Sequence, residues 1–228
     1  MTRPLAIWDV NGTLIDSRRV IQDAMARAFE AEGYPAPGYE RTRQIVGLSL
    51  HEAVAGLAPD LEGAALARLV EAYKHAFIAN RSEGRGHEPM YAGARETLER
   101  LANAGWSLAI ATGKSRRGLR VLFELHGIEP LFDTVWCADD GPGKPHPFLV
   151  LEALNALGAQ ARQAVMIGDT SHDVLMARAA GVRAHAVSWG FHRADELEAA
   201  GADWLHHDFT GLNSGLDRFA AGLKGEAA

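Results

Sequence analysis

The stretch that decides the fold class is residues 5–17, Leu-Ala-Ile-Trp-Asp-Val-Asn-Gly-Thr-Leu-Ile-Asp-Ser. The four apolar residues Leu5–Trp8 predict a short buried strand. Asp9 follows at once, and Gly12 indicates a turn. In an open α/β sheet, ligands bind beyond the carboxyl ends of the strands. The polar side chains that follow this strand are therefore candidates for chemistry.

From residue 91 onward, short apolar runs alternate with helical patterns. Apolar strands separated by helical crossovers predict a parallel sheet covered on both faces, an α/β, doubly wound, Rossmann-like core. The further predicted strands are Ser107–Ala111, Thr134–Cys137, Ala164–Gly168, Arg183–Val187 and a short last strand, Asp203–Leu205. The predicted helices are residues 94–104, 115–126, 145 or 147 to 157, 171–180 and a terminal helix.

The segment 16–90 differs because it is helical throughout. Two apolar stripes at helical spacing run through it: Ile21, Met25, Ala28 and Phe29, then Leu66, Leu69, Val70, Tyr73 and Phe77. We expect an inserted all-helical cap domain of residues 16–90 and a core domain of residues 1–15 and 91–228. In the alternative interpretation, these helices are extra layers on the sheet.

Composition bounds the class of protein. At about 150 residues per domain, 228 residues allow one domain and a smaller second unit. The net charge of −6 argues against an electrostatic nucleic-acid binder. The single cysteine, Cys137, forms no internal disulfide, and we expect it in the core. We find no apolar run of membrane-spanning length and no signal-peptide pattern, so we expect a cytoplasmic protein, either a monomer or a homodimer.

Polar residues follow four of the predicted strands. Asp9 follows the first, Thr112 the second, Lys144 comes after the third, and Asp169 and Asp173 follow the fourth. Carboxylate oxygens suit Mg²⁺, and Thr112 and Lys144 can bind phosphate oxygens. A metal ion also offsets the repulsion between a carboxylate and an anionic substrate. The combination predicts a site for a divalent cation and a phosphoryl group.

Each of these residues also has a purely structural interpretation. Asp169 or Ser171 would be suitable N-caps of the next helix, Lys144 would be suitable as a solvated loop residue, and the glycines nearby would suit turns. These polar residues occur together at the ends of four strands, and that combination favours a functional site.

The residues resemble the four motifs of the haloacid dehalogenase superfamily, in order and spacing, over essentially the whole chain. Residues 9–17 resemble the first motif, usually D-x-D-G-T-L-x-D-S. Thr112 resembles the second, Lys144 in Lys-Pro-His-Pro the third, and Gly-Asp-Thr-Ser-His-Asp at 168–173 the fourth. The nearest resemblance is to the phosphoglycolate phosphatase-like branch, and the helical insertion sits where that family carries a cap.

This resemblance implies a Mg²⁺-dependent phosphatase for a small phosphorylated metabolite. Asp9 would attack phosphorus and form an aspartyl-phosphate. The implied metal ligands are the Asp9 carboxylate, the backbone carbonyl of Asn11 and Asp169, with Asp173 in the first or second shell.

The resemblance also implies a binding site for the phosphoryl group. Gly12, Thr112 and the Gly113 amide would hold the phosphoryl oxygens, while Lys144 would stabilise charge and orient Asp9. The implied catalytic residues are thus Asp9, position 11, Thr112 and Lys144.

Position 11 departs from the family pattern, which has Asp where this chain has Asn11. In the family's phosphatases and mutases, that Asp protonates the leaving group and then activates water, and an amide does neither. Positioned acid–base catalysis contributes about 10²–10⁴-fold, so we expect slowed turnover.

Three interpretations of Asn11 stay open: an introduced change, a naturally weak or specialised enzyme that uses another acid, or a phosphate-binding protein without turnover. A phosphosugar mutase would depend even more on the missing Asp. A dehalogenase is disfavoured, because Gly168-Asp169 looks like the family's metal-site signature.

The sequence also carries three weaker signals. One or two cationic residues in or beside the helical insertion are candidates for binding an anionic substrate tail, from the set Arg18, Arg19, Arg43, His51, Lys74 and Arg81. Gly47-Leu48-Ser49 is a candidate loop facing the site. His206 and His207 have no spaced partner, and we expect them at the surface.

Overall fold

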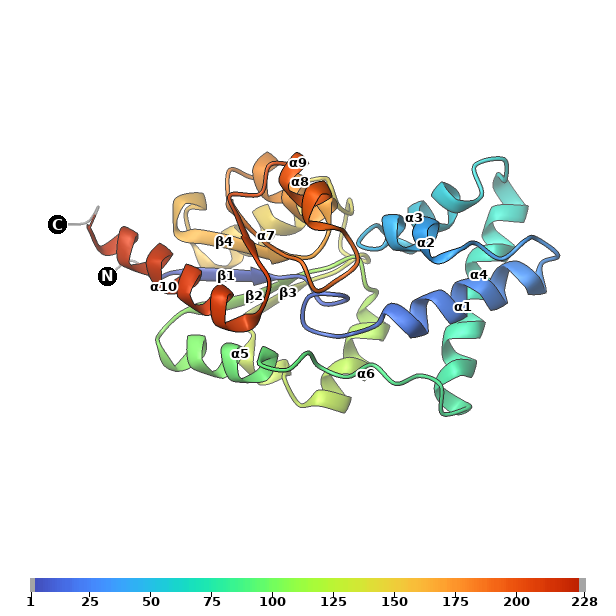
Figure 1. Ribbon diagram of the computed structural model, residues 1–228, viewed down its shortest axis with the longest axis horizontal. Coiled ribbons are helices and arrows are strands. Elements are labelled where there is room, and N and C mark those ends of the chain that lie inside the picture. Colours follow the sequence, from blue (N-terminus) through green and yellow to red (C-terminus); the bar gives the residue numbers. More distant parts are fainter. Residues whose placement is uncertain (1–2, 226–228) are drawn as a thin grey trace.

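The computed structural model describes residues 3–225, and its centre is one six-stranded parallel sheet (Figure 1). The strand order is β3-β2-β1-β4-β5-β6. The strands are β1 (Leu5–Trp8), β2 (Ser107–Ala111), β3 (Thr134–Trp136), β4 (Ala164–Gly168), β5 (Arg183–Val187) and β6 (Trp204–His206). The predicted doubly wound parallel sheet is therefore confirmed.

The order of the strands reverses next to β1. From β1 the chain builds outward through β2 and β3 on one side, and then returns to β4 on the other. Leu5 lies opposite both Ser107 of β2 and Ala164 of β4, so the three strands are in register. A reversal of this kind opens a crevice at the carboxyl ends of the two strands, and ligands bind there in doubly wound sheets.

The central strands bury both of their faces. Ala6 and Trp8 point into one hydrophobic cluster, while Leu5 and Ile7 point into the other, as the two-residue period of a strand requires. One cluster contains side chains from α5 (Ala94–Asn103), α6 (Arg116–His126) and α10 (Phe209–Gly225). The other contains side chains from α7 (Phe148–Leu157), α8 (Ser171–Ala179) and α9 (Ala194–Ala199).

The predicted element bounds agree with the structure to within a few residues. Two strands differ: Cys137 lies just outside β3, and the last strand is Trp204–His206 instead of Asp203–Leu205. Helix α9 was not predicted, because six residues are too few to show an apolar period. Cys137 is fully buried in the core, as expected.

Four helices lie beyond the carboxyl ends of the strands, on the right of Figure 1. They build a hydrophobic cluster of their own, which also includes Phe191 from the loop after β5. The two predicted stripes meet in it, with Ile21 and Met25 from one and Leu69 from the other. The helices are α1 (Arg18–Ala31), α2 (Tyr39–Ile45), α3 (Leu50–Leu57) and α4 (Gly63–Ser82).

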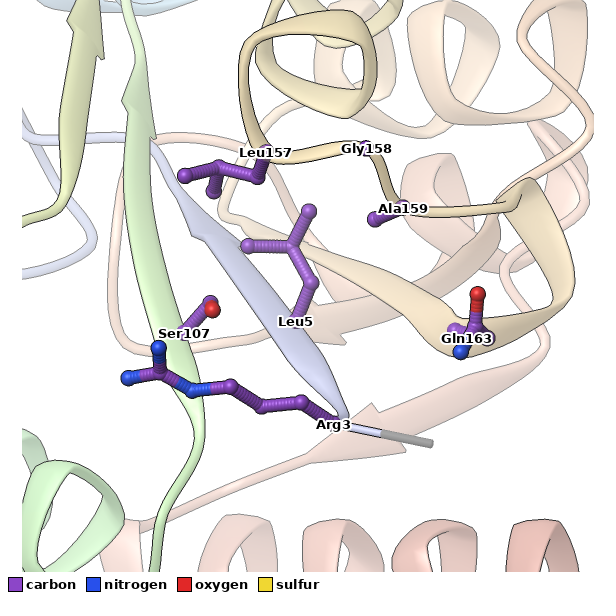
Figure 2. Close-up of a pocket in the computed structure, with 7 residues that line it drawn as sticks. All are labelled: Arg3, Leu5, Ser107, Leu157, Gly158, Ala159 and Gln163. Atoms are coloured by element: carbon purple, nitrogen blue, oxygen red, sulfur yellow. The ribbon is translucent and has the colours of Figure 1, made fainter. Parts of the chain in front are cut away.

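A cavity of about 500 Å³ opens at the amino ends of the strands, away from the crevice (Figure 2). It lies beside Leu5 and Ser107, the first residues of β1 and β2. The Arg3 side chain on its wall donates hydrogen bonds to the carbonyls of Gly105 and Trp106. Arg3 thus ties the start of β1 to the start of β2, which is a structural role.

Among the described helices, none is both long enough and apolar enough to cross a membrane.

Candidate active site

Three carboxylates meet at the crevice. Asp9 follows β1, Asp169 follows β4, and Asp173 lies in the first turn of α8. One oxygen from each lies within 4.8 Å of the others, and all three residues are at most 1% exposed. The fold therefore brings together the three acids that the sequence placed at strand ends.

Lys144 lies between two of these carboxylates. Its Nζ is 2.6 Å from Asp9 Oδ1 and 2.5 Å from Asp173 Oδ1, and the residue is fully buried. Burial disfavours the charged ammonium, but the two carboxylates outweigh burial and raise the pKa of Lys144. The side chain is therefore charged, and it fixes the orientation of Asp9.

Asp169 is held by residues from two loops. Its Oδ1 accepts a hydrogen bond of 2.7 Å from the Thr13 hydroxyl, and its Oδ2 accepts one of 2.8 Å from the Phe191 amide. Gly12 and Gly190 lie so close that a Cβ on either would be 2.1 Å from Asp169 Oδ2. Gly12 also has a φ of +89°, which favours glycine. Both glycines are needed to leave room for this carboxylate.

Asp173 also belongs to the capping box of α8. The N-cap of that helix is Thr170, whose hydroxyl and amide both donate to Asp173 Oδ2, at 2.6 and 3.0 Å. The structural interpretation that made Asp169 or Ser171 the cap is therefore wrong. Asp173 points its other oxygen at Lys144, so the same carboxylate stabilises the helix and borders the site.

The charge balance of this cluster fits a divalent cation. Burial raises the pKa of Asp9, and Asp173 raises it further against the opposing effect of Lys144. Burial, followed by the charges of Asp9 and Asp173, raises the pKa of Asp169 well above its ordinary value. Asp9 Oδ2 is buried and has no hydrogen-bond partner among the described residues. Lys144 pairs with two of the three carboxylates, and the group as a whole offers the oxygen ligands that a hard divalent cation takes.

Two of the four predicted phosphate-binding residues, Thr112 and Gly113, follow β2 directly, while Gly12 lies against Asp169 and Lys144 lies between Asp9 and Asp173. Thr112 is buried and Gly113 half-buried, and both line a pocket that also contains Asp9 and Asn11. A Cβ on Gly113 would be 2.4 Å from the Gly47 carbonyl oxygen, so only glycine allows this close approach. The predicted loop Gly47-Leu48-Ser49 does line the site.

A charged cluster that was not predicted from the sequence lies beside Asn11. The Lys114 ammonium lies 3.3 Å from Asn11 Oδ1 and 3.3 Å from Glu88 Oε1. Glu88 is buried and also forms an ion pair with Arg81 of α4. Burial lowers the pKa of Lys114, against the opposing charge of Glu88. Lys114 is the third residue after β2, so its position near a strand end was the available signal.

The pocket between the sheet and the four helices has a volume of about 840 Å³. Asp9, Asn11 and Thr112 form one end, and residues of α1, α3 and α4 and the loop before α3 form much of the wall. Three of the six cationic residues predicted as candidates line it: His51, Lys74 and Arg81. The Arg43 guanidinium instead forms an ion pair with Glu196.

Residues 6–187 match the haloacid dehalogenase-like hydrolases. The chain belongs to this family. Among its curated relatives is a probable phosphatase, IndB, of Dickeya dadantii. The two are 36% identical over 87% of this chain and 86% of the relative.

Two further likenesses cover most of this hydrolase. A phosphoglycolate phosphatase of Vibrio parahaemolyticus is 29% identical over 88% of this chain and 90% of its own length. The crystal structure of a hydrolase from Pseudomonas syringae superposes with a TM-score of 0.84 at 26% identity, covering 95% of this chain and 99% of that one. The resemblance inferred from the motifs is therefore confirmed.

Proposed function

We propose that this hydrolase is a Mg²⁺-dependent phosphatase that forms an aspartyl-phosphate on Asp9 and acts on phosphate monoesters of small metabolites. The observation that carries the proposal is the buried cluster of Asp9, Asp169, Asp173 and Lys144, whose member Asp9 lines a pocket large enough for a metabolite. The names of the curated relatives, a probable phosphatase and a phosphoglycolate phosphatase, agree with it.

The metal site in this proposal consists of the carboxylates of Asp9, Asp169 and Asp173 and the backbone carbonyl of Asn11. A bound Mg²⁺ supplies the positive charge that lets an anionic nucleophile approach a phosphate dianion. Asp9 Oδ2, which is buried without a partner, is the oxygen that most needs such an electrophilic neighbour.

The chain's own residues perform the two chemical steps. An Asp9 oxygen forms a bond to phosphorus while the bond from phosphorus to the alcohol oxygen breaks, and the alcohol leaves with a proton from solvent or a nearby acid. Water then attacks phosphorus and releases inorganic phosphate and the Asp9 carboxylate. Thr112, Gly12 and the Gly113 amide hold the phosphoryl oxygens, and Lys144 holds Asp9 in line through its 2.6 Å contact.

Asn11 sets the rate in this proposal. Its side chain lines the pocket beside Asp9, where the family's acid–base residue belongs. The amide cannot exchange a proton with the leaving oxygen or with water. We therefore assign this chain a slow phosphatase activity. The residues 16–90 act as a cap that covers the pocket and excludes water during turnover.

The test is the rate of p-nitrophenyl phosphate hydrolysis with Mg²⁺ and with a chelator, for the parent chain and for Asn11→Asp. We expect Mg²⁺-dependent turnover, and an increase in kcat of at least about tenfold in Asn11→Asp, below the usual acid–base contribution. Asp9→Asn is the inactive control. Because Asn-Gly pairs deamidate readily, peptide mass analysis must show that position 11 of the parent sample is still Asn.

The same experiment separates the second candidate function, a phosphate-binding protein without turnover, which Asn11 favours. Inactivity of both the parent and Asn11→Asp, with phosphate binding retained, would support the binding protein. Equal rates for the two forms would show that position 11 has no acid–base role.

A further inference from the structure

Most of the pocket wall beyond the reacting end is apolar. Its principal side chains come from α1, from the loop before α3 and from α4: Ile21, Met25, Val46, Leu48, Tyr73 and Phe77. Water held against such a wall is displaced favourably by an apolar ligand, at about 25 cal/mol per Å² of apolar surface removed from water. The wall therefore favours a ligand that is itself apolar.

Two aromatic rings lie next to each other on this wall. Tyr73 and Phe77 are one helical turn apart on α4, with ring centroids 5.9 Å apart and planes at 39°. Both are half-buried and line the pocket. Burial raises the pKa of the Tyr73 hydroxyl, so the ring is uncharged at neutral pH. A planar ring on the ligand would find partners for offset or edge-to-face stacking here.

Three of the cations on the same wall are already paired. Lys114 and Arg81 share the buried carboxylate of Glu88, and Lys74 lies 2.7 Å from Glu71. Both Lys114 and Arg81 also sit over the ring of Phe77, at 5.2 and 5.4 Å from its centroid. A second anionic group that approached Lys114 or Arg81 would be repelled by Glu88. Arg117, which is exposed and lines the pocket from α6, forms no ion pair with a described residue.

We propose that the substrate of this pocket is a phosphate monoester of an alcohol that carries an uncharged, apolar ring. The proposal rests on the proposed phosphatase function for its chemistry, but the ring preference is a property of the wall. A volume of about 840 Å³ lies within the range of pockets that enclose drug-sized ligands. A two-carbon ester such as 2-phosphoglycolate would leave most of the apolar wall in contact with water.

The first test measures binding without turnover. Calorimetry in the presence of Mg²⁺ compares benzylphosphonate, which carries an uncharged ring, with phosphonoacetate, which carries a carboxylate. We expect the Kd of benzylphosphonate to be lower by at least about tenfold. A Kd for phosphonoacetate equal to or below that of benzylphosphonate would overturn the proposal, whether or not the chain is an active phosphatase.

The second test localises the preference to the wall. Tyr73→Ala should raise the Kd of benzylphosphonate by about tenfold, because it removes one stacking partner and its buried area, and should change the Kd of phosphonoacetate less than twofold. Tyr34→Ala is the matched control, since Tyr34 packs on the same helical cluster outside the pocket. Equal losses for both ligands in Tyr73→Ala, or an equal effect of Tyr34→Ala, would refute the assignment.

Hydrolysis of benzyl phosphate and 2-phosphoglycolate gives the kinetic counterpart, since both are esters of primary alcohols. We expect a kcat/KM at least about tenfold higher for benzyl phosphate. Failure to hydrolyse either ester, with the ring preference in binding retained, would reject the phosphatase and leave the proposed ligand class standing. A higher kcat/KM for 2-phosphoglycolate would reject the ligand class and leave the phosphatase standing.

Discussion

Gly190→Ala is expected to weaken the metal site although Gly190 carries no side chain that could bind anything. A Cβ at this position would lie 2.1 Å from Asp169 Oδ2 and 2.4 Å from Asp169 Cγ. Ordinary van der Waals contact begins at 3.4 Å. The carboxylate or the loop must therefore move by roughly 1.3 Å, in a core that resists overpacking.

This displacement would disturb the Asp169 carboxylate, which is held by hydrogen bonds. Asp169 accepts hydrogen bonds from Thr13 and Phe191, and a shift of this size breaks at least one of them. Loss of the groups that orient a metal ligand costs about 10–100-fold in metal affinity. A misplacement of about 1 Å at a reacting centre costs about 100-fold in rate. We expect the Kd for Mg²⁺ to rise at least about tenfold and kcat to fall by a similar factor or more.

Calorimetric Mg²⁺ titration of the parent and of Gly190→Ala measures this effect, with circular dichroism to verify that the variant is folded. Gly222→Ala is the matched control, because a Cβ there meets nothing within 4 Å. If folded Gly190→Ala binds Mg²⁺ within twofold of the parent, the assignment of Asp169 as a metal ligand held by this loop is refuted.

Two further predictions concern buried charge. Lys144→Met leaves Asp9 and Asp173 without their buried cation. We expect urea unfolding without Mg²⁺ to give a free energy of unfolding about 3 kcal/mol lower than that of the parent, and Mg²⁺ to restore part of it. Unchanged stability would contradict the ion-pair network. Burial lowers the pKa of His185 to about 3 and that of His206 to about 4, below the ordinary 6.5. The unfolded chain therefore binds protons that the folded chain does not, and stability present above pH 6.5 should fall as the pH drops toward 4. Urea unfolding at pH 7 and pH 5 should show a smaller fall for His206→Phe than for the parent, and equal falls would argue against this pair as a cause.

The central strands could be predicted from sequence because they are buried on both faces. A strand such as Leu5–Trp8 is apolar at every position, so its identity does not depend on which face points where. The order of the motifs then placed Asp9, Thr112, Lys144 and Asp169 at one edge, because the carboxyl ends of parallel strands meet there. Helix α9 and the exact limits of the last strand escaped prediction, since three to six residues carry too little periodicity.

The expectation that His206 lies at the surface is wrong, for a reason of register. His206 is the last residue of β6, is 6% exposed, and lies 3.0 Å from the ring of His185 on β5. Its neighbour His207 is exposed. Adjacent residues of a strand point to opposite faces, and a three-residue strand does not reveal in the sequence which of two adjacent histidines points inward.

Some residues of the candidate site match no sequence motif, because they contribute a close backbone approach or an ion pair that forms only in the folded chain. Gly190 and Phe191 follow β5, and the strand-end rule that selected Asp9 would have selected their loop as well. Glu88 had no signal of its own, since its partners Arg81 and Lys114 come from a helix and a strand end that only the fold brings together. Likewise, the side of α4 that faces the pocket depends on how that helix packs.

The energetics of the cluster bear on what Asn11 means. The cluster buries three carboxylates and one ammonium, those of Asp9, Asp169, Asp173 and Lys144. Their burial carries a desolvation cost that hydrophobic side chains of similar volume would avoid. A bound divalent cation offsets this cost, because the ion that binds only the folded state stabilises it. The amide at position 11 leaves the carboxylates and the backbone carbonyl in place. In the proposed function, Asn11 therefore lacks the proton donor while the charge arrangement for a cation and a phosphoryl group stays intact, so we expect its effect in kcat and not in the affinity for Mg²⁺.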